Sequence, residues 1–214
     1  MKSALYAFAP DVAKDTYQRL KKMMGADVHV HVDRIVLRHA ARYIKANDYV
    51  VGRDVLDVAC GSGYGALILS NATSYRGIDL DPRAVREAKR EFAEFKYGEG
   101  SIYDLPLPDN SVMAITSFET LEHVDRPKTA MGEIARVLTP GGVLIGSIPI
   151  NHPDRIHHFK PYTAAEAYDI FTSANLSTKA LFVQSEMTFG EIRPADVAAV
   201  NGGTLVAVML KNPA

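Results

Sequence analysis

The chain has 214 residues, of which 47% are apolar and 23% are charged, and its formal net charge is −1. This composition excludes a disordered or fibrous chain, and the length fits a single domain with a substantial core. A near-neutral charge also argues against a domain that holds long nucleic acid through clustered Lys and Arg, so we expect no nucleic-acid partner.

The single cysteine, Cys60, excludes an intramolecular disulfide, and we interpret it as a small residue packed beneath a turn. No apolar run after Lys2 is long enough for a signal peptide, and no segment reaches membrane-spanning length. We therefore expect a soluble cytoplasmic protein. The sequence carries no signal for its oligomeric state.

Two helices are predicted in the first 50 residues. The first covers residues 11–24 and is ended by Gly25, and the second covers residues 32–46 and carries an apolar stripe. Both precede the most informative stretch of the chain.

That stretch is a buried strand that runs into a glycine-rich turn and then a helix. Residues 55–59 are apolar except for Asp57, as in a parallel strand. Gly61, Gly63 and Gly65 lack a Cβ, so the backbone can turn tightly and approach a ligand closely. Residues 64–71 begin a helix whose N-terminus favours a polar or anionic group. The pattern predicts a nucleotide-type site.

The flanking residues indicate which nucleotide is bound. No Gly-Lys-Ser/Thr follows the loop, which excludes a P-loop, and the G-x-G-x-G spacing differs from the G-x-G-x-x-G of dinucleotide sites. The next strand ends on Asp79, where a carboxylate can bind ribose hydroxyls. Asp57 would repel a pyrophosphate but suits a cationic amino-acid portion.

The rest of the chain alternates strands with helices, which predicts a doubly wound α/β sheet with its ligand at the strand C-termini. The last two strands have no clear helix between them and are predicted to pair antiparallel at the sheet edge. After the strand that ends at Asp79, the expected helices cover residues 82–92, 127–138 and 163–174, and the strands cover 112–117, 142–148, 178–184 and 204–210.

A polar cluster follows the strand at 112–117. Glu119, Glu122 and His123 are spaced i, i+3 and i+4, so one helical turn would place all three on one face. Two carboxylates and an imidazole suit Mg²⁺ or Mn²⁺. His123 could instead act as a base or orienting group without a metal, and a purely structural role for the cluster is a third interpretation.

These features resemble the class I S-adenosylmethionine-dependent methyltransferases, in particular the subset with the DxxCGxGxG motif, over roughly residues 34–172. The resemblance implies a Rossmann-like, seven-stranded, mostly parallel sheet with an antiparallel edge strand, helices on both faces and an N-terminal helical lid. It also implies a single domain, with residues 1–50 as a helical cap and 51–214 as the core.

The resemblance implies roles for individual residues. Glu119 and His123 would be catalytic, and a histidine after the fifth strand, His157 or His158, could complete a metal site with Glu119, Glu122 and His123. The family usually has an acid at Ser101 and Phe-Asp at Val112-Met113. The implied cofactor-binding residues are Asp57, Ala59, Gly61, Gly63, Asp79, Leu80, Ser101, Ile102 and Phe118.

The resulting hypothesis is O-methylation of a small or sugar-like hydroxyl acceptor, with S-adenosylmethionine as donor and Mg²⁺ or Mn²⁺ as an optional assisting ion. Short motifs shared with methyltransferases of bacterial glycan assembly support a glycan acceptor. The alternatives are N-methylation of a small amine, 2′-O-methylation of an RNA terminus, and a non-catalytic cofactor-binding partner subunit.

Overall fold

The computed structural model describes residues 34–152, 158 and 160–213. The helix predicted at residues 11–24, and with it most of the predicted cap and lid, lies outside these residues. Within the described part of the chain, no helix combines the length and apolar character needed to cross a bilayer.

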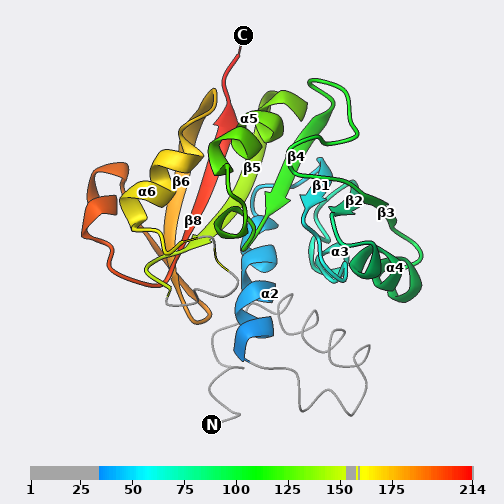
Figure 1. Cartoon of the computed structure of the whole chain (residues 1–214), viewed down its shortest axis with the longest axis horizontal. Coiled ribbons are helices and arrows are strands. Elements are labelled where there is room, and N and C mark those ends of the chain that lie inside the picture. The colour runs from blue at the N-terminus through cyan, green and yellow to red at the C-terminus, as the bar shows by residue number, and fades with distance from the viewer. Residues whose placement is uncertain (1–33, 153–157, 159, 214) are drawn as a thin grey trace.

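The described residues form one mixed sheet of eight strands in the order β3-β2-β1-β4-β5-β8-β6-β7 (Figure 1). The first five strands in this order are parallel, and β8 runs antiparallel between β5 and β6. The strands are β1 (Asp54–Val58), β2 (Ser74–Asp79), β3 (Lys96–Glu99), β4 (Val112–Ser117), β5 (Leu138–Pro149), β6 (Leu176–Ser185), β7 (Thr188–Glu191) and β8 (Thr204–Lys211).

Helices cover both faces of this sheet, as predicted. The helices are α2 (Arg34–Ala46), α3 (Gly65–Ile68), α4 (Pro82–Glu91), α5 (Pro127–Val137) and α6 (Ala164–Phe171), with 3₁₀ turns η2 (Leu121–His123) and η3 (Pro194–Ala199). Helices α2, α3 and α4 pack on one face, and α5 and α6 pack on the other.

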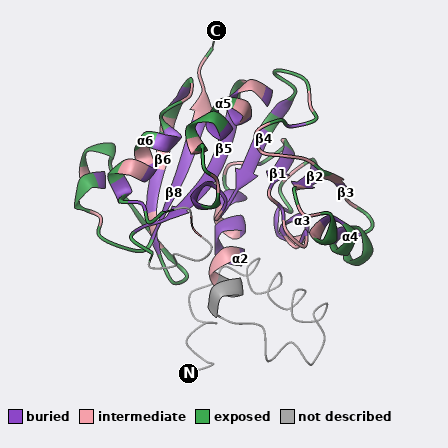
Figure 2. Cartoon of the chain, viewed as in Figure 1, coloured by how far each residue is buried: buried purple, intermediate pink, exposed green. Residues whose placement is uncertain are grey.

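Side-chain alternation along the strands builds a separate core on each face. In β8, Leu205, Ala207 and Met209 join the core beneath α5 and α6, whereas Val206 and Val208 join the core beneath α2, α3 and α4. Figure 2 shows the strands buried along most of their length and the outer side of α4 exposed. The sheet, packed on both faces, therefore supports the candidate site.

The predicted α/β class is confirmed, with two differences in detail. The sheet has eight strands rather than seven, because β7 forms a hairpin with β6, and the antiparallel strand β8 lies inside the sheet rather than at its edge. The sequences of β3 and β7, Lys-Tyr-Gly-Glu and Thr-Phe-Gly-Glu, are short and largely polar, and neither strand is identifiable from apolar alternation.

The helix after the glycine loop is also shorter than predicted and ends at Ile68 instead of near residue 71. The buried Asn47 side chain at the end of α2 donates to the Ile68 carbonyl at 2.6 Å and accepts from the Asn71 amide at 3.2 Å. These bonds satisfy backbone groups that another helical turn would have used, so α3 stops there.

Candidate functional site

The buried Asp57 carboxylate lies beneath the glycine loop. It accepts hydrogen bonds from three hydroxyls, those of Tyr43 at 2.9 Å, Tyr75 at 2.7 Å and Thr116 at 2.7 Å. Burial raises the pKa of Asp57 to about 6, and the three hydrogen bonds partly oppose this shift. Its exposed fraction is 0%, so the carboxylate supports the loop from below and offers no surface to a ligand.

The three glycines of the loop differ in the space around their Cα atoms. A Cβ at Gly65 would lie 2.5 Å from the Tyr43 ring, and a Cβ at Gly63 (φ +83°) would lie 2.7 Å from the Tyr97 ring. Gly61 also has a left-handed backbone, with φ +55°, but a Cβ there would meet nothing within 4 Å. Packing therefore requires glycine at Gly63 and Gly65, whereas Gly61 faces open space in which a ligand can approach the backbone.

Asp79 at the end of β2 holds the outer side of the loop. One carboxylate oxygen accepts from the Gly61 amide at 2.8 Å, and the other accepts from the Asp81 amide at 2.9 Å. The next residue, Leu80, is 73% exposed. The carboxyl ends of β1 and β2 thus form one polar edge beside an exposed apolar side chain, as at ligand-binding edges of open α/β sheets.

The remaining predicted cofactor residues lie on neighbouring segments. The Gly100 amide donates to the Asp79 carbonyl at 3.0 Å, which anchors the segment carrying Ser101 and Ile102 next to β2. Phe118 follows β4 and packs edge-on against the Tyr43 ring, 4.9 Å between centroids. Ala59, at the end of β1, has a positive φ of 61°.

Glu119 does not share a helical turn with Glu122 and His123. It has φ +51° and precedes the 3₁₀ turn η2, so its side chain is directed toward α2. There its carboxylate lies 3.2 Å from the Arg42 guanidinium and accepts from the Ser147 hydroxyl at 3.3 Å. The left-handed backbone at this position had no sequence signal and separates Glu119 from the predicted cluster.

Glu122, His123 and His158 do come together. One potential ligand atom from each lies within 4.8 Å of the others, and His123 Nε2 is 3.9 Å from Glu122 Oε1. Glu122 is buried, and neither of its oxygens accepts a hydrogen bond within the described part of the chain. Burial first, and then the negative charge of Glu119, raise its pKa well above the usual range, although Arg42 opposes the shift.

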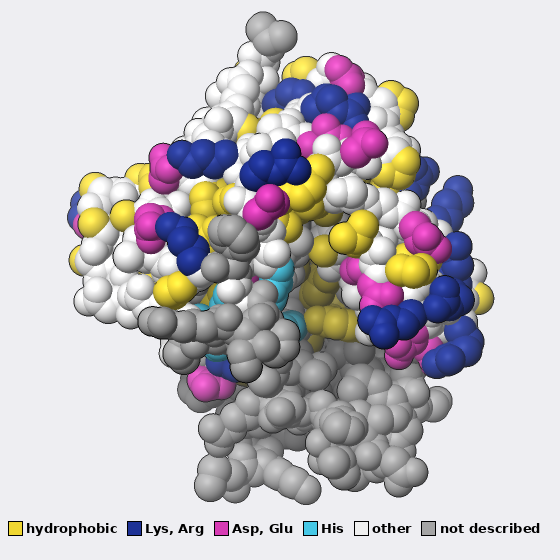
Figure 3. Space-filling model, viewed as in Figure 1, with side chains coloured by type: hydrophobic (Ala, Val, Ile, Leu, Met, Phe, Trp, Pro, Cys, Tyr) yellow, Lys and Arg dark blue, Asp and Glu magenta, His cyan; other side chains and the backbone are white. Residues whose placement is uncertain are grey.

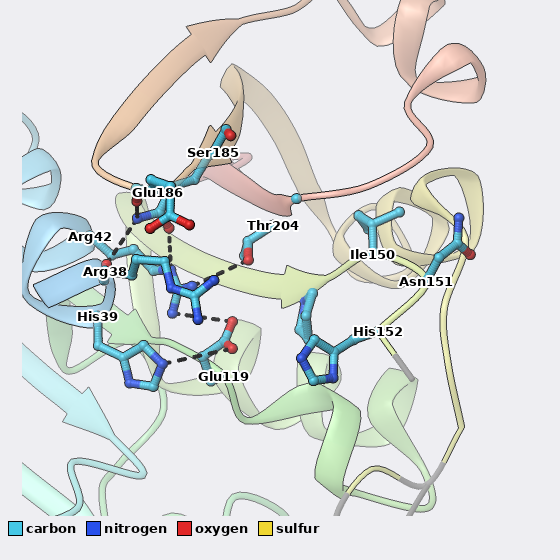
Figure 4. A pocket seen from close by; sticks show the side chains of 13 residues that line it. Arg38, His39, Arg42, Glu119, Ile150, Asn151, His152, Ser185, Glu186 and Thr204 are labelled. Atoms are coloured by element: carbon cyan, nitrogen blue, oxygen red, sulfur yellow. Dashed lines mark hydrogen bonds and ion pairs between the residues drawn. The ribbon is translucent and has the colours of Figure 1, made fainter. Parts of the chain in front are cut away.

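Arg42 is a buried residue that the sequence did not single out. Its Nε donates to Gln184 Oε1 at 2.6 Å, its Nη2 donates to Thr204 Oγ1 at 3.2 Å, and its Nη1 pairs with Glu119. The side chain is 3% exposed. It therefore joins α2 to β6, β8 and the segment after β4 (Figure 4).

These groups border a cavity of about 250 Å³ at the carboxyl ends of β5 and β6 and the amino end of β8. Arg38, His39 and Arg42 line it from α2, and Glu119 and His152 line it from the segments after β4 and β5. Figure 3 shows histidine side chains gathered near the centre of the visible face. In the sequence, Arg38 and Arg42 are spaced by one turn of the predicted helix. Such spacing of charges does not by itself identify a cavity.

Comparisons with known proteins address the family directly. A methyltransferase domain family matches residues 56–146. A protein of Mycolicibacterium smegmatis named "Probable S-adenosylmethionine-dependent methyltransferase" is 30% identical over 186 residues, which cover 81% of this chain and 70% of that protein. A fatty-acid O-methyltransferase of the same organism is 34% identical over 101 residues, covering 45% of this chain and 37% of that enzyme.

The fold has a counterpart in the crystal structure of a TehB-like methyltransferase from Corynebacterium glutamicum. The TM-score is 0.65 at 20% identity, and the match covers 95% of this chain and all of the other, at 100%. The sequence relatives and this fold agree with the family predicted from the glycine loop. The chain belongs to the S-adenosylmethionine-dependent methyltransferases.

Proposed function

We propose that the chain transfers a methyl group from S-adenosylmethionine to an oxygen nucleophile on a small or sugar-like acceptor. The observations that carry this proposal are the polar edge formed by Gly61 and Asp79 and the cavity lined by Arg38 and Glu119. Phe118, which packs on the Tyr43 ring, directly precedes Glu119 in the chain. The Gly61–Asp79 edge can hold the donor, and the cavity can hold the acceptor.

The residues at this edge fit the cofactor. The open space at Gly61 would let the methionine end approach the backbone, and the Asp79 carboxylate would bind the ribose hydroxyls. Exposed Leu80 and the anchored segment of Ser101 and Ile102 would flank the adenine. Asp57, with no exposed surface, would act by fixing the loop rather than by touching the cofactor.

When bound, S-adenosylmethionine supplies an electrophilic methyl group on a sulfonium. In-line transfer then depends mainly on how the acceptor is positioned. Glu119 lines the cavity next to Phe118 and is held there by Arg42 and Ser147, so its carboxylate can orient a hydroxyl or receive its proton. His123, the last residue of η2, is a second group that could receive this proton.

The relatives are compatible with oxygen as the nucleophile, since one of them is named a fatty-acid O-methyltransferase. A small amine would use the same site, because Glu119 could equally bind a cationic acceptor. A panel of hydroxyl, carboxyl and amine acceptors, followed by mass spectrometry of the products, separates these two chemistries.

The buried Glu122 supports a second proposal, a divalent-cation site formed with His123 and His158. Its buried carboxylate accepts no hydrogen bond within the described residues, and such a buried charge is costly unless it is protonated or paired with a cation. Carboxylate and imidazole ligands suit Mn²⁺ or a similar ion. Bound there, the ion would hold the η2 segment against the loop after β5.

For Asp79→Asn we expect S-adenosylhomocysteine to bind at least about tenfold more weakly, because the ribose hydroxyls lose a charged hydrogen-bond acceptor. Isothermal titration calorimetry measures this change. Asp54→Asn, at the opposite end of β1, is the matched control and should bind within about twofold of the wild type. Equal affinities for Asp79→Asn and the wild type would contradict the assignment of Asp79.

For Asp57 we expect a stability that depends on pH with a defined sign. Because burial raises its pKa from 3.8 to about 6, the folded state binds the proton more tightly than the unfolded state. The Asp57 contribution to the free energy of unfolding should therefore fall by about 3 kcal/mol as pH rises from about 4 to about 6, and stay constant above that range.

Urea unfolding of the wild type and Asp57→Asn at several pH values isolates this contribution, since the variant cannot ionise at this position. The difference between the two unfolding free energies should move against the wild type as pH rises. A difference that is independent of pH would show that the carboxylate is not held in a buried site.

For Glu122→Gln we expect Mn²⁺ binding to be lost, because the amide cannot provide the anionic ligand. Calorimetry and the electron paramagnetic resonance signal of free Mn²⁺ both measure it. Glu91→Gln, on the exposed surface of α4, should bind Mn²⁺ like the wild type. Identical binding by Glu122→Gln and the wild type, or no binding by either, would reject the metal site.

A further inference from the structure

The cavity beside α2 has an uneven distribution of charge. Arg38 and Arg42 project from α2 one helical turn apart, so their positive charges repel each other. Arg42 donates hydrogen bonds to Gln184 and Thr204, and its Nη1 forms an ion pair with Glu119 but no hydrogen bond. One of the two guanidinium groups is therefore committed to holding the fold together.

Arg38 is the other. Its Nε is buried without a hydrogen-bond partner, and it forms no ion pair with any residue that the structure describes. A guanidinium presents a planar fork of donors that matches the oxygens of a carboxylate or phosphate. A half-buried Arg with an unsatisfied donor is therefore a ready site for an oxyanion (Figure 4).

The surrounding charges favour an anion as well. Burial, and next the positive charge of Arg42, lower the pKa of His39, and Arg38 acts in the same direction while Glu119 opposes it. Glu119 is itself paired with Arg42, and Glu186 at the rim is exposed, where solvent screens its charge. Among the residues that the structure describes, no carboxylate forms an ion pair with Arg38, so its positive charge is available to an anion.

We propose that this cavity binds an anionic group of the methyl acceptor, a carboxylate or a phosphate, through the Arg38 guanidinium. This inference rests on the proposed function and narrows its substrate class. With the anion at Arg38, the rest of the acceptor extends toward Glu119, which lines the same cavity. Arg38 is a specificity-determining residue, and Arg42 positions Glu119.

The test uses three probes that share a ring and differ in charge: benzoate, phenyl phosphate and uncharged benzyl alcohol. Saturation-transfer NMR measures their affinities for the full chain in the presence of S-adenosylhomocysteine. We expect at least one of the two anions to bind and the alcohol not to bind. The stronger of the two anions identifies the carboxylate or the phosphate as the preferred group.

Arg38→Gln should weaken binding of that anion by at least about tenfold, and Arg38→Lys, which keeps the charge but loses the fork, should fall in between. Arg90→Gln on α4 removes an equal charge elsewhere and should bind the anion within about twofold of the wild type. Thermal melting of every variant verifies folding, and Arg38→Lys provides a second reading if Arg38→Gln does not fold.

The proposal is overturned if neither anion binds the wild type, if benzyl alcohol binds as well as the anions, or if the Arg38 variants bind like the wild type. Calorimetry with S-adenosylhomocysteine on the same samples keeps the two proposals apart. If the wild type does not bind S-adenosylhomocysteine, the methyltransferase proposal is rejected. Normal cofactor binding with no Arg38-dependent anion binding would reject only the anion site.

Discussion

The buried carboxylate of Asp57 is the constraint on which the rest of this site depends. A charge with no exposed surface is destabilising unless hydrogen bonds replace its hydration. Here the replacement comes from three hydroxyls on three different elements, Tyr43 of α2, Tyr75 of β2 and Thr116 of β4. Satisfying one carboxylate therefore fixes α2 and two strands around the end of β1, directly beneath the glycine loop.

Arg42, on the other side of α2, likewise joins distant segments of the chain through buried polar contacts. One helix thus carries both Tyr43, which donates to Asp57 beneath the glycine loop, and Arg42, which contacts Glu119, Gln184 and Thr204. Since both are buried polar groups with specific partners, α2 can take only one position over the carboxyl ends of the strands. Helix α2 therefore contacts both the Asp57 carboxylate beneath the glycine loop and the cavity lined by Arg38 and Glu119.

Local sequence predicted those features that depend on local backbone chemistry. The spacing of Gly61, Gly63 and Gly65 predicted the loop, and the acid that ends β2 predicted a carboxylate, that of Asp79, at the same edge of the sheet. The sequence could not predict contacts between distant segments, such as that of Arg42 with Gln184, 142 residues apart. It also missed the left-handed backbone of Glu119, because a glutamate carries no signal for φ +51° and tertiary contacts impose it.

Hydrogen–deuterium exchange with and without S-adenosylhomocysteine tests the central claim, that the loop held by Asp57 and Asp79 is the cofactor site. Ligand binding should slow exchange in peptides covering residues 57–66 and 79–82. Exchange in the β6–β7 hairpin, residues 182–191, should stay unchanged. Saturating ligand with no slowing at the glycine loop, or with slowing confined to other segments, would contradict this account of the site.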